Sequence, residues 1–288
     1  MKRLLLQLDS SRQASTFDQV VAHDAGADVV MARGGITPAD VRDLVHGCIF
    51  TRAPKDLKNT AVFIGGTDMA AGEAILGAAQ AAFFGPLRVS LMLDSNGSNT
   101  TAVAAVMKVA QALGGPVRGV RAVVTAGTGP VGQRVAGLLA RAGADVLITS
   151  RRREDGERAR EAIVKRFGGT VRADCLTDAG QAAVCLEGAR VLVNCGPAGV
   201  QIVPRAAWTA DPGLTVAVDL NAVPPFGIEG IDPSEDGVVR GRVTCVGALG
   251  VGKLKMKIHR AAIARLFESN DAVLDAESIH VLAEQLAQ

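Results

Sequence analysis

A glycine-rich hexapeptide near the middle of the chain carries the clearest chemical signal. It follows an apolar stretch at 120–127 and opens a small-residue stretch at 130–142. Glycines at this spacing, between a strand and a helix, are typical of a turn that binds the pyrophosphate of a dinucleotide. The first permits a tight turn, the second lets the backbone approach the phosphates, and the third lets the helix pack on the strand. The predicted contact residues are Gly127, Thr128, Gly129, Pro130, Val131 and Gly132.

A basic cluster follows the next expected strand and bears on the choice of nucleotide. That strand, over 145–150, ends in Ser150 and is followed by Arg151 and Arg152. A site that prefers NAD usually has Asp or Glu here, which accepts hydrogen bonds from the ribose hydroxyls. Guanidinium groups instead suit a ribose 2′-phosphate, which an acidic residue would repel. Ser150, Arg151 and Arg152 therefore predict NADP, with NAD accepted more weakly; the alternative is a solvated basic helix start.

The ends of two later apolar stretches are candidates for the nicotinamide side of the same site. Strands are expected over 189–196 and 214–221. In dinucleotide-binding domains the ligand lies over the carboxyl ends of the parallel strands. Cys195, Gly196 and Asn221 are predicted to line it, although a plain strand exit would have the same pattern.

Short polar side chains crowd the segment 93–101, between an apolar stretch and an apolar helix. Turn chemistry and capping of the helix explain only part of this segment. It holds more polar residues than a cap needs, which favours contact with a ligand. The candidates are its seven polar residues, Asp94, Ser95, Asn96, Ser98, Asn99, Thr100 and Thr101.

The order of the apolar segments predicts an α/β fold with two domains. Strand-like and helix-like segments alternate, which is typical of parallel sheets with helices on their faces. We expect an α/β substrate domain over 1–115 and a Rossmann-type, doubly wound nucleotide-binding domain over 116–252. Helices within 253–288 are expected to pack back on the first domain. The remaining expected elements are strands at 3–9, 60–66 and 87–94 and helices at 72–85, 100–115, 153–167, 253–269 and 275–288.

Composition excludes several classes of function. The 288 residues are 48% hydrophobic and have a formal net charge of +2, so neither nucleic acid nor a membrane is an expected partner. Five cysteines without a CxxC spacing indicate a reduced, cytoplasmic protein. Four histidines argue against a histidine-based metal site, so no metal is expected. The absence of tyrosine excludes the Tyr/Lys chemistry of short-chain dehydrogenases.

Several long motifs resemble those of one enzyme family of one-carbon metabolism. They include GGTDMAAGE, LDSNGSNTT, GTGPVG, DLNAVPPFGIEGID and GALGVGKLKMKIHRA. Along its whole length the chain resembles the bacterial NADP-dependent methylene-tetrahydromethanopterin dehydrogenases, some of which also accept methylene-tetrahydrofolate. The resemblance implies oxidation of the methylene bridge of a reduced pterin to the methenyl form, with hydride transfer to NADP⁺. It also implies a homo-oligomer, a trimer or a hexamer.

The same resemblance indicates residues that act on the pterin. Lys255 has the motif position of the family's active-site lysine, and Asp94, Asn96 and Thr100 lie in the motif that contacts the pterin. Loss of hydride leaves a cation shared by two pterin nitrogens and needs no proton abstraction, so positioning and electrostatics suffice. Lys255 is therefore expected either to hydrogen-bond a pterin carbonyl or amide nitrogen, or to be neutral. His259 is expected to be a helix-face residue rather than a catalyst.

Other functions share part of this pattern. A shikimate-type NADP-dependent dehydrogenase would have two α/β domains and a basic loop, but its Lys/Asp pair is not visible. A bifunctional folate dehydrogenase/cyclohydrolase uses a Tyr-x-x-x-Lys-like element, which a chain without tyrosine lacks. A non-catalytic NADP-sensing protein would bind the nucleotide without turning over a pterin.

Overall fold

The computed structural model describes residues 1–287 and has an α/β fold, as predicted. Its backbone contacts divide it into two compact units, each built on one sheet. The first unit contains Met1–Thr100 and the residues from Met256 onward, and the second contains Thr101–Lys255. Helices α4 (Ser98–Leu113) and α9 (Ala248–Arg265) each contribute to both units. The domain boundaries expected from the sequence stay predictions.

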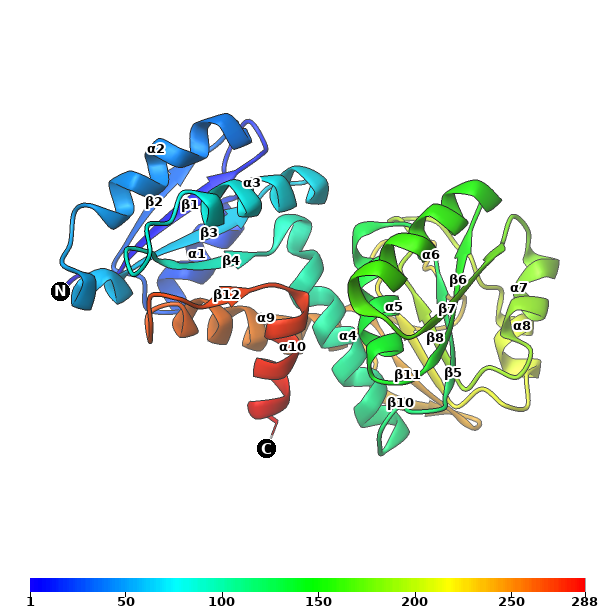
Figure 1. Ribbon diagram of the computed structural model, residues 1–288. Coiled ribbons are helices and arrows are strands. Elements are labelled where there is room, and N and C mark those ends of the chain that lie inside the picture. The colour runs from blue at the N-terminus through cyan, green and yellow to red at the C-terminus, as the bar shows by residue number, and fades with distance from the viewer. Residues whose placement is uncertain (288) are drawn as a thin grey trace. The chain divides into compact units, whose positions relative to one another are not determined.

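The first unit is built on a five-stranded sheet in which all neighbouring strands run parallel. Its strand order is β12-β4-β3-β1-β2 (Figure 1). The short strand β12 (Val273–Leu274) pairs with β4, so the C-terminal segment packs back on this sheet, as expected. The other strands are β1 (Leu4–Asp9), β2 (Val29–Arg33), β3 (Thr60–Gly65) and β4 (Ser90–Leu93).

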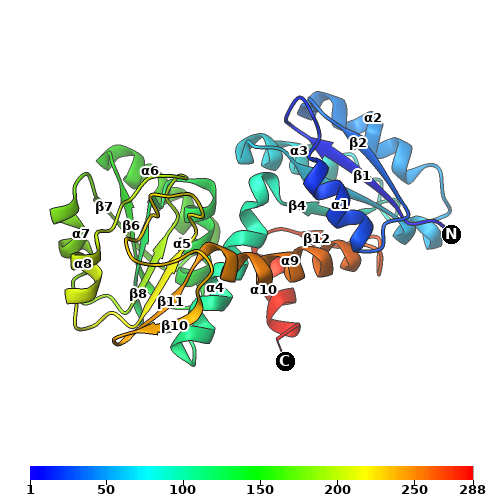
Figure 2. The same ribbon diagram turned by 180° about the vertical axis from the view of Figure 1, so that it is seen from behind.

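Helices cover both faces of this sheet, α2 and α3 on one and α1 and α9 on the other (Figures 1 and 2). Alternate strand residues point to opposite faces, which explains the division. Leu6 and Leu8 belong to a core with α2 and α3. On the other face Phe63 stacks on His259 of α9, with 5.7 Å between the ring centroids. The remaining helices of this unit are α1 (Thr16–Asp24), α2 (Pro38–Ile49), α3 (Met69–Ala81) and α10 (Ala276–Gln285), with short 3-10 turns at Pro54–Asn59 and Ser95–Gly97.

The second unit is built on a seven-stranded sheet with the order β10-β11-β9-β8-β5-β6-β7. All its pairs are parallel except the hairpin of β10 and β11. Without the edge strand β10, the order in chain numbering is 3-2-1-4-5-6, which is that of a Rossmann domain. The order reverses between β5 and β8, where such domains bind a dinucleotide. The strands are β5 (Arg121–Thr125), β6 (Asp145–Ser150), β7 (Thr170–Cys175), β8 (Val191–Asn194), β9 (Val216–Asp219), β10 (Asp236–Arg240) and β11 (Val243–Val246).

Helices also cover both faces of the second sheet, α5 and α6 on one and α7 and α8 on the other (Figure 1). Gly137 of α5 packs so closely on Phe167 of α6 that an added Cβ would lie 2.3 Å from the ring. On the opposite face Trp208, the chain's single tryptophan, is buried with Val123 and Leu192. These helices are α5 (Pro130–Arg141), α6 (Arg153–Phe167), α7 (Ala179–Leu186) and α8 (Arg205–Ala210).

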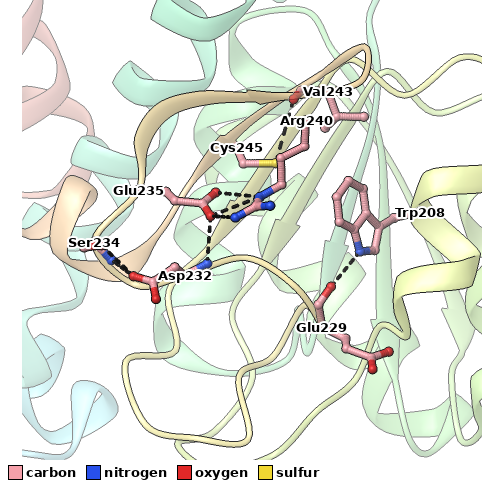
Figure 3. A network of polar contacts seen from close by, with 8 residues as sticks. All are labelled: Trp208, Glu229, Asp232, Ser234, Glu235, Arg240, Val243 and Cys245. Atoms are coloured by element: carbon pink, nitrogen blue, oxygen red, sulfur yellow. Dashed lines mark hydrogen bonds and ion pairs between the residues drawn. The ribbon is translucent and has the colours of Figure 1, made fainter.

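A polar network fixes the antiparallel edge of the second sheet (Figure 3). The buried carboxylate of Glu235 forms an ion pair with Arg240, the last residue of β10. Glu235 also accepts a hydrogen bond from the backbone N–H of Asp232, at 3.2 Å. A buried carboxylate requires such partners, because its desolvation is otherwise costly. The network therefore holds in place a strand whose residues are all exposed.

The elements expected from the sequence are present, with ends that differ by a few residues. Helix α3 begins at Met69 rather than 72 because Asp68 caps it, accepting hydrogen bonds from the N–H groups of Ala70 (2.8 Å) and Ala71 (3.1 Å). Helix α9 begins inside the glycine-rich segment that precedes its expected start. The helix expected over 275–288 is α10, and its predicted end at Gln288 lies outside the described residues.

Candidate functional site

The glycine-rich hexapeptide forms the turn between β5 and α5. Gly127 and Gly132 are buried. An added Cβ would lie 2.5 Å from Cβ of Ile148 at Gly127, and 2.7 Å from the carbonyl oxygen of Ala126 at Gly132. At Gly129 the nearest atom to an added Cβ is 3.6 Å away. Packing therefore requires the outer two glycines, whereas the space beside Gly129 is open to a ligand.

The start of α5 has the properties of an anion site. Pro130 is the first helical residue, and the N-cap residue is Gly129, which has no side chain that could cap the N–H groups of the first turn. The N–H groups at a helix start have no acceptor within the helix and carry partial positive charge. Thr128 and Val131, on the same turn, are half-buried. A pyrophosphate beside Gly129 could accept hydrogen bonds from these N–H groups.

Ser150, Arg151 and Arg152 follow one another but have different surroundings. Ser150 is buried at the end of β6, and its Oγ accepts a hydrogen bond from the backbone N–H of Arg152 at 3.3 Å. Arg152 forms an ion pair with Asp155, with 2.5 Å between Nε and Oδ2, and Asp155 also pairs with Arg158. Arg151 is exposed and, in the part of the chain that the structure describes, forms no ion pair.

The carboxylate of Asp155, which pairs with both Arg152 and Arg158, shifts the pKa of Arg152 and has its own pKa shifted in return. The hydrogen bond from Arg152 is the main reason why the pKa of Asp155 is lowered. The same bond raises the pKa of Arg152. Both side chains therefore stay charged and paired at neutral pH, so a phosphate ligand would compete with Asp155 for Arg152 but not for Arg151.

Cys195 and Gly196 follow β8, the strand next to β5 and its glycine turn, and Asn221 lies just after β9, one strand further along the sheet. The N–H of Cys195 donates to the carbonyl oxygen of Thr125, the last residue of β5, at 3.2 Å. Asn221 is buried, and its Oδ1 accepts a hydrogen bond from the N–H of Val223 at 2.9 Å. Burial, and then the nearby Asp219 carboxyl, raise the pKa of the Cys195 thiol, which is therefore protonated at neutral pH.

Most polar side chains of the segment 93–101 are buried and bonded within the chain. Oδ1 of Asp94 accepts hydrogen bonds from the N–H groups of Asn99 (2.9 Å) and Thr100 (3.0 Å), at the start of α4. The hydroxyl of Thr100 donates to Oδ2 of Asp94 at 2.6 Å. Asn96 differs, because it is exposed and has a left-handed backbone with φ of 56°. Asp94 and Thr100 thus build the loop that presents Asn96, and contact of all three with a ligand stays a prediction.

Lys255 differs from its lysine neighbours on α9. It is half-buried, whereas Lys253 and Lys257 are exposed. His259 lies one turn further along the same helix face and is fully buried against Phe63. Lys255 is therefore the lysine on the covered side of the helix, and its catalytic role stays a prediction.

Comparison with known proteins identifies the family. A family model described as methylene-tetrahydromethanopterin dehydrogenase, N-terminal, matches residues 16–96. The chain is 33% identical over 299 residues to an NAD(P)-dependent methylenetetrahydromethanopterin dehydrogenase of Methylorubrum extorquens, across 99% of each chain. This chain belongs to the methylene-tetrahydromethanopterin dehydrogenase family. It is also 47% identical over 286 residues to a protein of the same organism named bifunctional protein MdtA, again across 99% of each.

Solved structures share the fold of this family member at low sequence identity. Shikimate 5-dehydrogenase of Listeria monocytogenes matches with a TM-score of 0.55 and 12% identity, covering 100% of this chain and 96% of the other. The 5-ketofructose reductase of Gluconobacter sp. strain CHM43 matches with a TM-score of 0.51 and 15% identity, covering 99% of each. At such identities the likeness concerns the fold alone.

Within its described residues this methylene-tetrahydromethanopterin dehydrogenase family member has neither a cluster of metal ligands nor a membrane-spanning helix. No group of three or more His, Cys, Asp or Glu side chains there could hold a metal ion. Nor does any described helix have the length and apolar character needed to cross a membrane.

Sequence reasoning did not single out three polar residues in the second unit of this family member. Thr125, Asn194 and Asp219 are the last residues of β5, β8 and β9, and all three are buried. Each follows an apolar run, so a polar residue at the end of three separate runs was the available signal. Their contact with one another depends on strand register, which the sequence alone does not give.

Proposed function

We propose that this chain oxidises 5,10-methylene-tetrahydromethanopterin, 5,10-methylene-tetrahydrofolate, or both, to the methenyl form, with NADP⁺ as the hydride acceptor. The observation that carries the proposal is the match, across 99% of each chain, to an NAD(P)-dependent methylenetetrahydromethanopterin dehydrogenase. The Rossmann strand order and the open space at Gly129 support the nucleotide part.

The charges near the end of β6 support NADP as the preferred nucleotide. The pyrophosphate would lie against Gly129 and the first N–H groups of α5. The guanidinium of Arg151 would bind the 2′-phosphate, while Arg152 would add positive charge and stay partly engaged with Asp155. NAD lacks this phosphate and would therefore bind more weakly.

The reaction requires positioning rather than acid–base catalysis. When bound, NADP⁺ supplies an acceptor for the hydride that leaves the methylene carbon. The pterin keeps a positive charge shared by its two bridge nitrogens, and no proton leaves in this step. A cationic Lys255 beside the methylene carbon would oppose that charge, so we place its hydrogen bond on a pterin carbonyl oxygen. Asn96 would hold the pterin through its exposed amide, on the loop that Asp94 and Thr100 build.

Domain roles, assembly and location complete the proposal. We assign residues 1–115, with the helices of 253–288, to the pterin and residues 116–252 to NADP. Identical chains would associate as a trimer or hexamer, as the family resemblance implies. The five cysteines are all free, which fits a reducing cytoplasm. Light scattering on the purified protein measures the mass of the particle in solution. A mass equal to that of one chain would reject the trimer or hexamer.

Initial rates test the proposed reaction. Methylene-tetrahydromethanopterin and methylene-tetrahydrofolate are each supplied with NADP⁺ and with NAD⁺, and the absorbance of the methenyl product and reduced nicotinamide is followed. We expect turnover with at least one pterin and higher kcat/KM with NADP⁺. Binding of NADP⁺ without turnover of either pterin would reject the pterin assignment and leave a nucleotide sensor.

A further inference from the structure

Three neighbouring strands of the second sheet end in polar residues that lie side by side. Thr125 of β5 is in register with Asn194 of β8, and Asn194 is in register with Asp219 of β9. Each of the three is at most 1% exposed. Their positions are the last in each strand, next to the glycine turn and to the loops that contain Cys195, Gly196 and Asn221.

The three side chains form one directed chain of hydrogen bonds. The hydroxyl of Thr125 donates to Oδ1 of Asn194 at 2.6 Å. The amide nitrogen of Asn194 donates to Oδ1 of Asp219 at 2.7 Å. Buried polar groups that satisfy one another in this way fix a single arrangement, because each alternative leaves a donor or acceptor without a partner.

This chain of bonds also holds the backbone of both adjoining loops. Oδ1 of Asn194 accepts a hydrogen bond from the N–H of Gly196 at 3.2 Å. Asp219 accepts one from the N–H of Asn221 at 3.0 Å and one from the N–H of Ile228 at 2.8 Å. The Asp219 carboxylate therefore accepts hydrogen bonds from both ends of the loop 221–228. Through its bond with Asn194 it is also linked to the loop after β8.

The loop closes directly onto these side chains. At Gly227 an added Cβ would lie 1.8 Å from the amide nitrogen of Asn194 and 2.9 Å from Oδ1 of Asp219. Burial raises the pKa of Asp219, and the hydrogen bonds from Ile228 and Asn194 oppose that rise. Every group bonded to Asp219 is a donor, so only an acceptor fits at this position.

We propose that Asp219 is a positioning residue that aligns the two loops lining the nicotinamide half of the bound nucleotide. The inference rests on the proposed nucleotide site but not on the identity of the pterin. It predicts that Asp219 affects ligands that carry a nicotinamide and leaves the adenosine half unaffected, since Gly129 and Arg151 belong to other loops.

The variant Asp219→Asn tests this role with little change in volume. Its amide group must place N–H opposite a donor, Asn194, Asn221 or Ile228, and so disturbs the loops. We expect the dissociation constant of NADP⁺ to rise by roughly 10-fold, while that of 2′,5′-ADP, which lacks nicotinamide, changes by less than about 2-fold. We expect kcat to fall further than the affinity, because hydride transfer depends on alignment of the nicotinamide.

Two further variants sharpen the result. In Asn194→Asp/Asp219→Asn the amide and carboxylate exchange places, so the bond between the two side chains re-forms, although the amide nitrogen at position 219 still faces the N–H of Asn221. Part of the lost NADP⁺ affinity should therefore return. Asp211→Asn is the matched control, because Asp211 accepts hydrogen bonds from the N–H groups of Gly213 (2.7 Å) and Leu214 (3.2 Å) before β9, at the opposite end of that strand. It should change neither ligand's affinity nor turnover.

The outcomes separate this role from others. Equal weakening of NADP⁺ and 2′,5′-ADP by Asp219→Asn, or unchanged binding of both, would overturn the proposal. If that variant does not fold, Thr125→Val removes the hydroxyl at the other end of the chain of bonds and keeps the side-chain shape. It must then weaken NADP⁺ selectively for the proposal to stand. Absence of pterin turnover in the unchanged protein would reject the proposed reaction, while the two binding measurements would still decide the role of Asp219.

Discussion

Arg151 and Arg152 are adjacent in the chain, yet only one of them has a carboxylate partner among the described residues. Arg152 is held by Asp155, whereas Arg151 is exposed and forms no ion pair there. An arginine that already pairs with a carboxylate gains less from a phosphate, since it must give up or share that partner. The sequence predicts that both arginines contact the 2′-phosphate, and we expect Arg151 to contribute more than Arg152.

Single alanine variants test this ranking. Arg151→Ala should weaken NADP⁺ by roughly 10- to 100-fold, the range for a lost charge-assisted bond, and barely affect NAD⁺. Arg152→Ala should have a smaller effect, because Arg152 is already paired with Asp155 and gains less from a phosphate. Titration calorimetry measures both nucleotides. Lys165→Ala, which removes an exposed charge at the far end of α6, should leave both affinities unchanged. Equal losses for the two nucleotides would contradict a 2′-phosphate contact.

Lys255 is tested against its own neighbours on α9. Lys255→Ala should lower kcat by about 10-fold or more while NADP⁺ affinity holds, because its proposed contact is with the pterin. Lys253→Ala and Lys257→Ala remove the same charge from exposed positions and should keep full turnover. Steady-state kinetics with the better pterin provides the measurement. Similar losses in all three variants would instead indicate a general charge effect on substrate association.

At the scale of elements, the turn between β5 and α5 separates packing from ligand contact. Gly132→Ala places a methyl group against the carbonyl oxygen of Ala126 and should destabilise the unit by about 1–3 kcal/mol. Gly129→Ala meets nothing closer than 3.6 Å and has an ordinary φ of −74°, so the fold should tolerate it. Its methyl group would occupy the space proposed for the pyrophosphate and weaken both NADP⁺ and NAD⁺.

Thermal unfolding and nucleotide titration distinguish the two glycine variants. Gly132→Ala should lower the midpoint of unfolding, and Gly129→Ala should leave it unchanged while binding falls. Gly115→Ala is the control, because an added Cβ there meets nothing within 4 Å and the residue lies outside this turn. Unimpaired nucleotide binding by Gly129→Ala would contradict the proposal that the pyrophosphate lies beside Gly129.

The sequence predicts the elements whose residues are mostly buried, because burial leaves a recognisable apolar pattern. Strands β1, β3, β5 and β8 are near-continuous apolar runs, because helices cover them on both faces. Strand β10 is exposed along its length and depends on its pairing with β11 and on the ion pair between Glu235 and Arg240. No local pattern marks such a strand. The same holds for Asp94, whose hydrogen bonds within the chain appear only once the loop is folded.

At the scale of the whole molecule, each unit contains a buried thiol whose pKa is raised by burial. Burial raises the pKa of Cys48 in the first unit to about 11. Burial, and then the nearby Glu235, raise the pKa of Cys245 in the second unit to about 11 (Figure 3). The ordinary value for an unfolded thiol is 9.0. Below pH 9 these thiols are therefore protonated in both the folded and the unfolded protein, and their contribution to the free energy of unfolding is fully present.

Stability should decline as the pH rises from 9 to 11. In that interval the unfolded thiols lose protons that the folded thiols keep, so the free energy of unfolding falls by at most about 1.4 kcal/mol per pH unit for each thiol. Urea unfolding at pH 8 and pH 10, followed by the fluorescence of the single tryptophan Trp208, reports the unit that contains Cys245. Cys245→Ala should begin less stable at pH 8, because it leaves a cavity, and lose less between the two values. Cys175→Ala, which removes a half-buried thiol of the same unit, should keep the full decline. An undiminished decline in Cys245→Ala would show that other groups cause the loss of stability at high pH.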